Sequence, residues 1–227
     1  MEIFAPFFLC VIFLAAMYGL MRLFLYISNA SARRSVFKSG MYTPKTVHTL
    51  LLAEFGAKSI FSGKYLPRKT EKGTVYDAYD HILLLIGTVV IVKNCREDGR
   101  ITNTPLDETW DARIRTRSGN DRQISFTNPI AEGAKKKQAL AEVFTHAGCR
   151  FPIAVEHIVI FPSRRVSFVL PRQQQIMSPP EALRFLKKAN TREAFTKAQK
   201  KAIKKAISHF SKTESQIAAK SSKSRHR

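Results

Sequence analysis

Two charged residues at the edges of neighbouring apolar segments are the first candidates for chemistry. Asp80 comes directly before the segment HILLL, and Lys93 ends the segment TVVIVK. This arrangement is typical of phosphodiester cleavage with a divalent ion, in which carboxylates hold the ion and the lysine stabilises charge on the phosphate. Such chemistry also uses a carboxylate two residues before the lysine, and here that position is Ile91. The sequence therefore predicts a site that lacks one anionic ligand.

Another carboxylate candidate lies upstream. Residues 44–55 have helical periodicity, and Glu54 falls within the arc of their apolar positions. Glu54 is therefore either a site carboxylate or a residue at the helix end that reaches solvent. Asp77 is an alternative replacement for the missing ligand. His81 is expected to face away from Asp80, because successive side chains of a strand point to opposite faces.

The hairpin that carries Asp80 and Lys93 sets their relative position. Its two apolar segments are separated by a short turn at Ile86-Gly87. If this turn has an even number of residues, Ile82 lies opposite Ile91 and Asp80 lies opposite Lys93. We therefore expect the aspartate and the lysine on one face of a sheet, where they form either a catalytic pair or a cross-strand salt bridge.

The remaining chain alternates between predicted strands and helices. Turn residues, a glycine after a helix and the capping box SPPE mark the boundaries. We expect strands at Ser59–Leu66, on both sides of the turn at 118–120, at Phe151–Phe161 and at Val166–Leu170, and helices at 44–55, at 128–148, after Ser178 and at Phe195–Phe210. This order predicts an α/β fold in which helices flank a mixed β-sheet.

The charge of the chain is strongly one-sided. Its 227 residues include 38 Lys+Arg against 17 Asp+Glu, a formal net charge of +21. Such an excess predicts attraction to polyanions, either nucleic acid or an anionic membrane surface. Three cysteines without disulfide or zinc spacing fit a reducing compartment. The lysines that we expect to contact nucleic-acid phosphates are Lys135, Lys136, Lys137, Lys200, Lys201, Lys204 and Lys205.

The N-terminal segment is predicted to anchor the chain in a membrane. Residues 3–27 are almost all apolar and long enough for a spanning helix. A cleaved signal peptide is the alternative, but no basic segment precedes the apolar run. Arg33, Arg34 and Lys38 follow the span and place the rest of the chain in the cytoplasm, as in a single-pass cell-membrane protein.

This reading divides the chain into four parts. They are a transmembrane anchor at 1–28, a linker at 29–42, an α/β domain at 43–175 and a basic helical extension at 176–227. The extension is expected to be disordered after Ser211, where apolar residues become sparse.

Several of these features occur together in an order found in one family. They are the early helix with its glutamate, the run DHILLLIGTVVIVKN, GRI, Trp110, Asn128-Pro129 and the strand HIVIFP. Over residues 44–172 the chain resembles the nuclease-related domain (NERD) family of bacterial proteins, which has a restriction-endonuclease-like PD-(D/E)xK fold. The resemblance implies that Asp80 and Glu54 bind Mg²⁺ and that Asp80, Lys93 and Glu54 are the catalytic residues.

Two departures from the family pattern bear on function. Ile91 replaces the glutamate of the Glu-x-Lys element, and Glu132 stands where the family usually has a glutamine. The leading interpretation is a membrane-anchored domain that binds DNA or RNA and has an incomplete, impaired nuclease site. The alternatives are an active Mg²⁺-dependent nuclease with a carboxylate supplied from elsewhere, and a membrane-surface protein whose basic tail binds anionic lipid.

Overall fold

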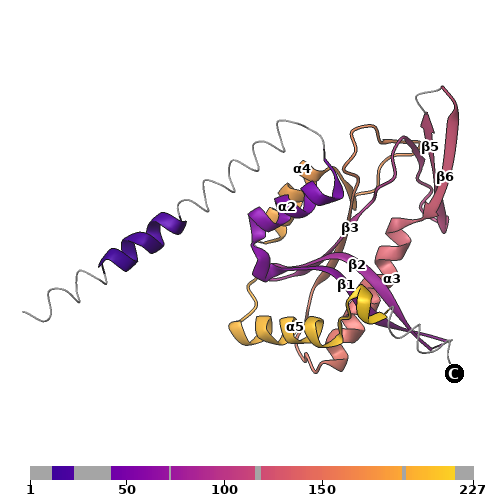
Figure 1. Cartoon of the computed structure of the whole chain (residues 1–227). Helices are drawn as coiled ribbons and strands as arrows, with labels where there is room; N and C mark the ends of the chain where they lie inside the picture. The colour runs from indigo at the N-terminus through magenta and orange to yellow at the C-terminus, as the bar shows by residue number, and fades with distance from the viewer. Residues whose placement is uncertain (1–11, 23–41, 72, 116–118, 191–192, 218–227) are drawn as a thin grey trace, which may run out of the picture. The chain divides into compact units, whose positions relative to one another are not determined.

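The computed structural model describes residues 12–22, 42–71, 73–115, 119–190 and 193–217 (Figure 1). The chain divides into one unit up to Met41 and a second unit from Tyr42 onward. In the first unit residues 12–22 are helical, and the rest of the predicted anchor lies outside the described residues. None of the described helices combines the length and the apolar character needed to cross a bilayer.

The larger of two sheets in the second unit is built on the predicted hairpin. Its order is β1-β2-β3-β7-β9. The pairs β1–β2 and β2–β3 are antiparallel, and the pairs β3–β7 and β7–β9 are parallel. These strands are β1 (Ile60–Thr70), β2 (Gly73–Leu84), β3 (Val89–Asn94), β7 (Val155–Ile160) and β9 (Ile176–Met177). Ile82 lies opposite Ile91, which confirms the predicted register of the hairpin.

The strands β1 and β2 extend further than predicted. The strand predicted to end at Leu66 continues through the polar residues that follow, until Thr70 pairs with Gly73. Gly73 has a φ of +117°, a conformation that favours glycine. Most side chains at this end of the ribbon are exposed or half-buried, so its strands need no apolar alternation.

The second sheet has the order β6-β5-β4-β8. Its strands are β4 (Arg100–Thr102), β5 (Thr109–Arg115), β6 (Asp121–Thr127) and β8 (Ser167–Phe168). The hairpin β5–β6, predicted from its Ser-Gly-Asn turn, stands at the upper right of Figure 1. Trp110 is buried in this part of the core, where its Nε1 donates a hydrogen bond to the Thr104 carbonyl at 2.8 Å.

Helices cover both faces of the larger sheet. They are α2 (Pro44–Phe55), α3 (Pro129–His146), α4 (Pro179–Ala189) and α5 (Lys197–Phe210), with a short 3-10 turn, η1 (Ala57–Ser59), after α2. On one face, Leu140 of α3 and Ile203 of α5 pack in a core with Ile91. On the other face lie α2 and α4, side by side (Figure 1). The predicted α/β class with a mixed sheet between helices is confirmed.

The segment predicted as a C-terminal extension is part of the same packing unit. Ile203 and Ile207 of α5 are fully buried against the sheet, so a boundary at residue 176 does not separate two bodies. The chain is also ordered beyond Ser211: Lys212 forms a bridge to Tyr65, with backbone hydrogen bonds of 2.9 and 3.1 Å. Residues 218–227 lie outside the described residues.

Candidate functional site

The residues singled out around Asp80 come together with side chains from α3 and β7. The group, called the Asp80 cluster below, consists of Asp80, Ile91, Lys93, Glu132, Lys136 and His157. These side chains pack tightly, without space for a water molecule between them. Asp80, Ile91 and Lys93 were predicted to lie together, whereas Lys136 and His157 were not predicted to lie beside them.

The start of α3 positions Glu132. Asn128 is fully buried, and its Oδ1 accepts hydrogen bonds from the N–H groups of Ile130 and Ala131 at 2.9 and 3.3 Å. Its Nδ2 donates to the Asp107 carbonyl at 2.8 Å. Asn128 thus caps the helix and ties it to the preceding loop. The Asn-Pro pair of the sequence is therefore the start signal of the helix that carries Glu132 to β3.

Glu132 is held between two lysines. Its Oε2 lies 3.6 Å from Nζ of Lys93, and its Oε1 accepts a short hydrogen bond from Nζ of Lys136. The Lys136 side chain is only 7% exposed and also donates to the Ala78 carbonyl. Burial alone would raise the pKa of Glu132, but the hydrogen bond and charge of Lys136, together with Lys93, lower it overall. The carboxylate is therefore an ionised member of a compact ion-pair network.

Asp80 takes a different partner from the one predicted. The hairpin ladder ends at the pair His81 and Val92, so Asp80 and Lys93 are not paired in it. Instead, Oδ2 of Asp80 accepts a hydrogen bond from the backbone N–H of Asn94 at 2.8 Å. Burial lowers the pKa of Lys93, but the charges of Asp80 and Glu132 outweigh it and raise the pKa overall. The predicted salt bridge between Asp80 and Lys93 is therefore not formed: Lys93 pairs with Glu132, and Asp80 acts on it at longer range.

His157 closes the cluster from β7. Its ring packs directly on Gly133 of α3, where an added Cβ would come within 2.0 Å of Nδ1. Burial, reinforced by the charge of Lys136, lowers the pKa of His157 to about 4. The ring is therefore neutral at physiological pH. A glycine one residue after Glu132 was the only sequence signal of this close helix–strand contact.

His81 lies in a separate polar group beneath α2. Its Nδ1 is 2.9 Å from the Ser62 hydroxyl, which is also 3.3 Å from Nδ1 of His48, and the two imidazoles stack at 5.1 Å. Its Nε2 is 3.0 Å from Nδ2 of Asn94. Burial and the neighbouring His48 lower the pKa of His81 to about 4. This confirms that His81 faces away from Asp80. Asn94 joins the two groups, because its backbone holds Asp80 while its side chain holds His81.

Glu54 does not join Asp80. Its carboxylate pairs with Lys187 of α4, at 3.2 Å, and lines a recess near the end of β2 that contains no member of the Asp80 cluster. The side chain is 18% exposed. Glu54 is thus half-buried, as its place on the apolar arc suggested, but it faces lysines instead of the aspartate.

The predicted phosphate-contacting lysines fall into three environments. Lys136 is buried and cannot reach a nucleic acid, which corrects its assignment. Lys135 and Lys137 on α3 are exposed. On α5, Lys201 and Lys205 are exposed, whereas Lys200 and Lys204 are half-buried and line the recess beside Glu54.

The Asp80 cluster fits Mg²⁺ poorly. Mg²⁺ requires several hard oxygen ligands in octahedral geometry. Asp80 supplies one carboxylate, Ile91 supplies none, and the Glu132 carboxylate is already paired with the ammonium groups of Lys93 and Lys136. In the part of the chain that the structure describes, no three His, Cys, Asp or Glu side chains are grouped so that they could share a metal ion. Lys93 and Lys136 provide the positive charge that an ion would otherwise bring to Glu132.

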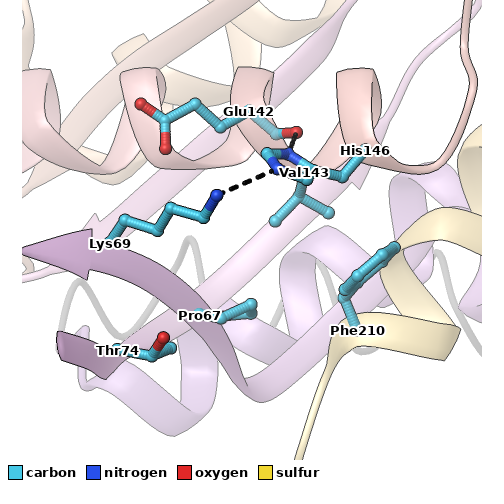
Figure 2. Close-up of a pocket in the computed structure, with 7 residues that line it drawn as sticks. All are labelled: Pro67, Lys69, Thr74, Glu142, Val143, His146 and Phe210. Atoms are coloured by element: carbon cyan, nitrogen blue, oxygen red, sulfur yellow. Dashed lines mark hydrogen bonds between the residues drawn. The ribbon is translucent and has the colours of Figure 1, made fainter.

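A second hollow lies between the β1–β2 ribbon, α3 and the end of α5 (Figure 2). His146 spans it: its Nδ1 contacts the Glu142 carbonyl at 2.7 Å, and its Nε2 lies 3.4 Å from Nζ of Lys69. The walls are otherwise mostly apolar, with Val143 from α3, Phe210 from the end of α5 and Pro67 from β1. Because this hollow shares no residue with the Asp80 cluster, it belongs to a different part of the surface.

Comparison with known proteins adds no relative: no family model, no curated protein and no solved structure matches this chain. The resemblance to the NERD family consequently rests on the motifs of the sequence itself.

Proposed function

We propose that this chain is a membrane-anchored, nuclease-related protein that binds nucleic acid through lysines and does not cleave it efficiently. In this proposal the sheet and its helices are a variant of the restriction-endonuclease-like fold, with Asp80 and Lys93 at the positions of its catalytic residues. The observation that carries the proposal is the engagement of Glu132 by two lysines, beside an apolar residue at position 91. The ion pairs of the Asp80 cluster are thereby suited to stabilise the packing of α3 on the sheet.

The exposed face of α5 supports binding to a polyanion. Ile203, Ala206 and Ile207 bury one side of the helix, which leaves Lys201 and Lys205 one turn apart on the other side. Lysines in such a row neutralise backbone phosphates and release counterions, which gives sequence-independent affinity. Lys135 and Lys137 add exposed charge on α3, which packs against α5 on the same face of the sheet.

The salt dependence of binding tests this surface. In fluorescence anisotropy with labelled duplex DNA, the full-length variant Lys201→Gln/Lys205→Gln should reduce the slope of log K against log salt by about 1.8, because each neutralised phosphate contributes about 0.9. A matched control, Lys45→Gln/Lys58→Gln, removes the same charge from exposed positions at α2 and η1 and should change the slope by less than half as much. Equal slopes for wild type and the α5 variant would contradict the proposal.

An active nuclease is the second candidate, and one observation favours it. Glu132 reaches Lys93 from α3 and so supplies a carboxylate near the position that Ile91 leaves apolar. This candidate requires that Glu132 exchange its lysines for an ion, with Mg²⁺ then held by Asp80 and Glu132. Binding to vesicles of anionic lipid without binding to DNA or RNA would instead support the membrane-surface alternative.

A further inference from the structure

The recess beside Glu54 is a built cavity that the proposed function does not use. Its walls come from the ends of α2 and β2, from Asn190 after α4 and from α5, and it encloses about 530 Å³ including the solvent at its mouth. About 190 Å³ inside the recess is accessible to water, which is less than pockets for drug-sized ligands enclose and suits a small anion. We call it the lysine recess, after Lys200 and Lys204, which line it one turn apart on α5.

The wall of the recess is fixed by hydrogen bonds across the chain. Oδ1 of Asn190 accepts the N–H of Ile86 at 2.7 Å, and the Ile86 carbonyl accepts the N–H of Phe195 at 2.8 Å. The turn between β2 and β3 is thereby tied to both C-terminal helices. Ser59, at the end of η1, also lines the recess. The lysines therefore face a preformed cavity, which reduces the ordering cost of binding.

The charges in the recess do not cancel. Glu54 is paired with Lys187 at its rim, at 3.2 Å. Among the described residues, neither Lys200 nor Lys204 forms an ion pair with a carboxylate, although both are half-buried. Two ammonium groups in a preformed cavity call for an anion with about two negative charges. A phosphate monoester carries close to this charge at neutral pH, whereas an internal phosphodiester carries one.

We infer that the lysine recess binds a phosphate monoester, and that within the proposed function this is the terminal phosphate of a nucleic-acid strand. Lys200 and Lys204 contact the phosphate oxygens, and Glu54 limits the affinity by its negative charge while it holds Lys187 at the rim. The exposed lysines of α5, on the outer side of the same helix, contact internal phosphates of the strand. The recess thus selects strand ends, whereas the outer face binds any polyanion.

Competition between matched oligonucleotides tests the inference. With the full-length chain, an oligonucleotide with a terminal phosphate should compete roughly tenfold better than the same strand with hydroxyl ends, a ratio typical of added charge-assisted hydrogen bonds. Lys200→Gln/Lys204→Gln should abolish this ratio. The control Lys197→Gln/Lys201→Gln should weaken both oligonucleotides alike and keep the ratio. A wild-type ratio near one, or a ratio that survives in the recess variant, overturns the inference.

Two further variants separate charge from folding and from catalysis. Lys200→Arg/Lys204→Arg keeps the positive charge and should keep the preference for the phosphorylated strand. Loss of the preference in this variant would show that the two lysines have only a structural role, which would contradict the inference. Glu54→Gln should raise the affinity for the phosphorylated end severalfold, because it removes a negative charge from the recess. Lower affinity in Glu54→Gln would contradict the assignment.

A nucleic-acid-free arm distinguishes failure of the recess from failure of the proposed function. Inorganic phosphate should raise the melting temperature of the wild type, at constant ionic strength, and should not raise that of Lys200→Gln/Lys204→Gln. If phosphate stabilises only the wild type but no oligonucleotide binds, the recess stands and the proposed function fails. If the chain binds vesicles that contain phosphatidic acid but does not prefer the oligonucleotide with a terminal phosphate, the assignment to a strand end is overturned.

Discussion

Replacing Glu132 by glutamine tests whether the Asp80 cluster is a structural ion-pair network. The change keeps the shape of the side chain but removes the counter-charge of Lys136, whose side chain is 7% exposed. Removing one partner of a buried ion pair costs about 3–5 kcal/mol. Because Glu132 is 27% exposed and glutamine still accepts a hydrogen bond, we expect a loss of about 2–3 kcal/mol in the free energy of unfolding.

A double-mutant cycle isolates the pair. Lys136→Met alone should also destabilise the fold, because it leaves Glu132 without its closest partner. The double variant Glu132→Gln/Lys136→Met should lose less than the sum of the two single variants, with a coupling of about 2 kcal/mol. Glu142→Gln, on the same helix, is the control: among the described residues Glu142 forms no ion pair and accepts a hydrogen bond from Gln138 at 3.3 Å, so this variant should stay within about 0.5 kcal/mol of wild type.

Urea denaturation followed by tryptophan fluorescence measures these differences. The chain has one tryptophan, Trp110, which is 1% exposed and so reports on loss of the core. If Glu132 were instead poised as a metal ligand near Asp80, removing its charge would relieve repulsion between carboxylates. A Glu132→Gln variant as stable as wild type, or more stable, would refute the structural interpretation.

Three further predictions concern the same core. The pKa values of His81 and His157 lie near 4, below the ordinary value of 6.5, so the unfolded chain binds more protons than the folded chain between these pH values. The free energy of unfolding should therefore fall as the pH decreases from 6.5 to 4, by up to about 3 kcal/mol for each histidine. In urea titrations His157→Gln should flatten this pH profile, and an unchanged profile would show that the His157 ring is already charged in the folded chain. Gly133→Ala should cost about 1–3 kcal/mol by thermal unfolding, because its Cβ overlaps the His157 ring, and unchanged stability would disprove that contact. Ile91→Glu should raise Mg²⁺ affinity in calorimetry while it lowers stability, because Ile91 is 1% exposed; a stable variant without added Mg²⁺ affinity would contradict the placement of position 91 beside Asp80.

The sequence predicted the hairpin and most helix boundaries because these depend on local patterns. The register of Ile82 with Ile91 follows from apolar positions on both sides of a short turn, and the capping box at Ser178 follows from neighbouring residues. The sequence did not predict the end of β1 after Leu66 or the start of β2 at Gly73, because an exposed ribbon needs no apolar alternation. Order after Ser211 was missed because it depends on backbone pairing with β1.

The side-chain partners of the site were harder to predict. Glu132 and Lys187 come from helices far along the chain from Lys93 and Glu54, so tertiary packing decides their contacts. Burial of Lys136 could have been anticipated, because apolar residues follow it three, four and seven positions later on the same helical face.

Binding without cleavage is tested most directly by incubation of full-length protein with labelled DNA and RNA in Mg²⁺ or Mn²⁺, with binding and cleavage read from the same samples. Wild type should retard the strands and leave them intact, and Asp80→Ala and Lys93→Ala should do the same. Cleavage by wild type that both substitutions abolish would show that Asp80 and Lys93 form a working catalytic site, and the active-nuclease candidate would replace the binding proposal.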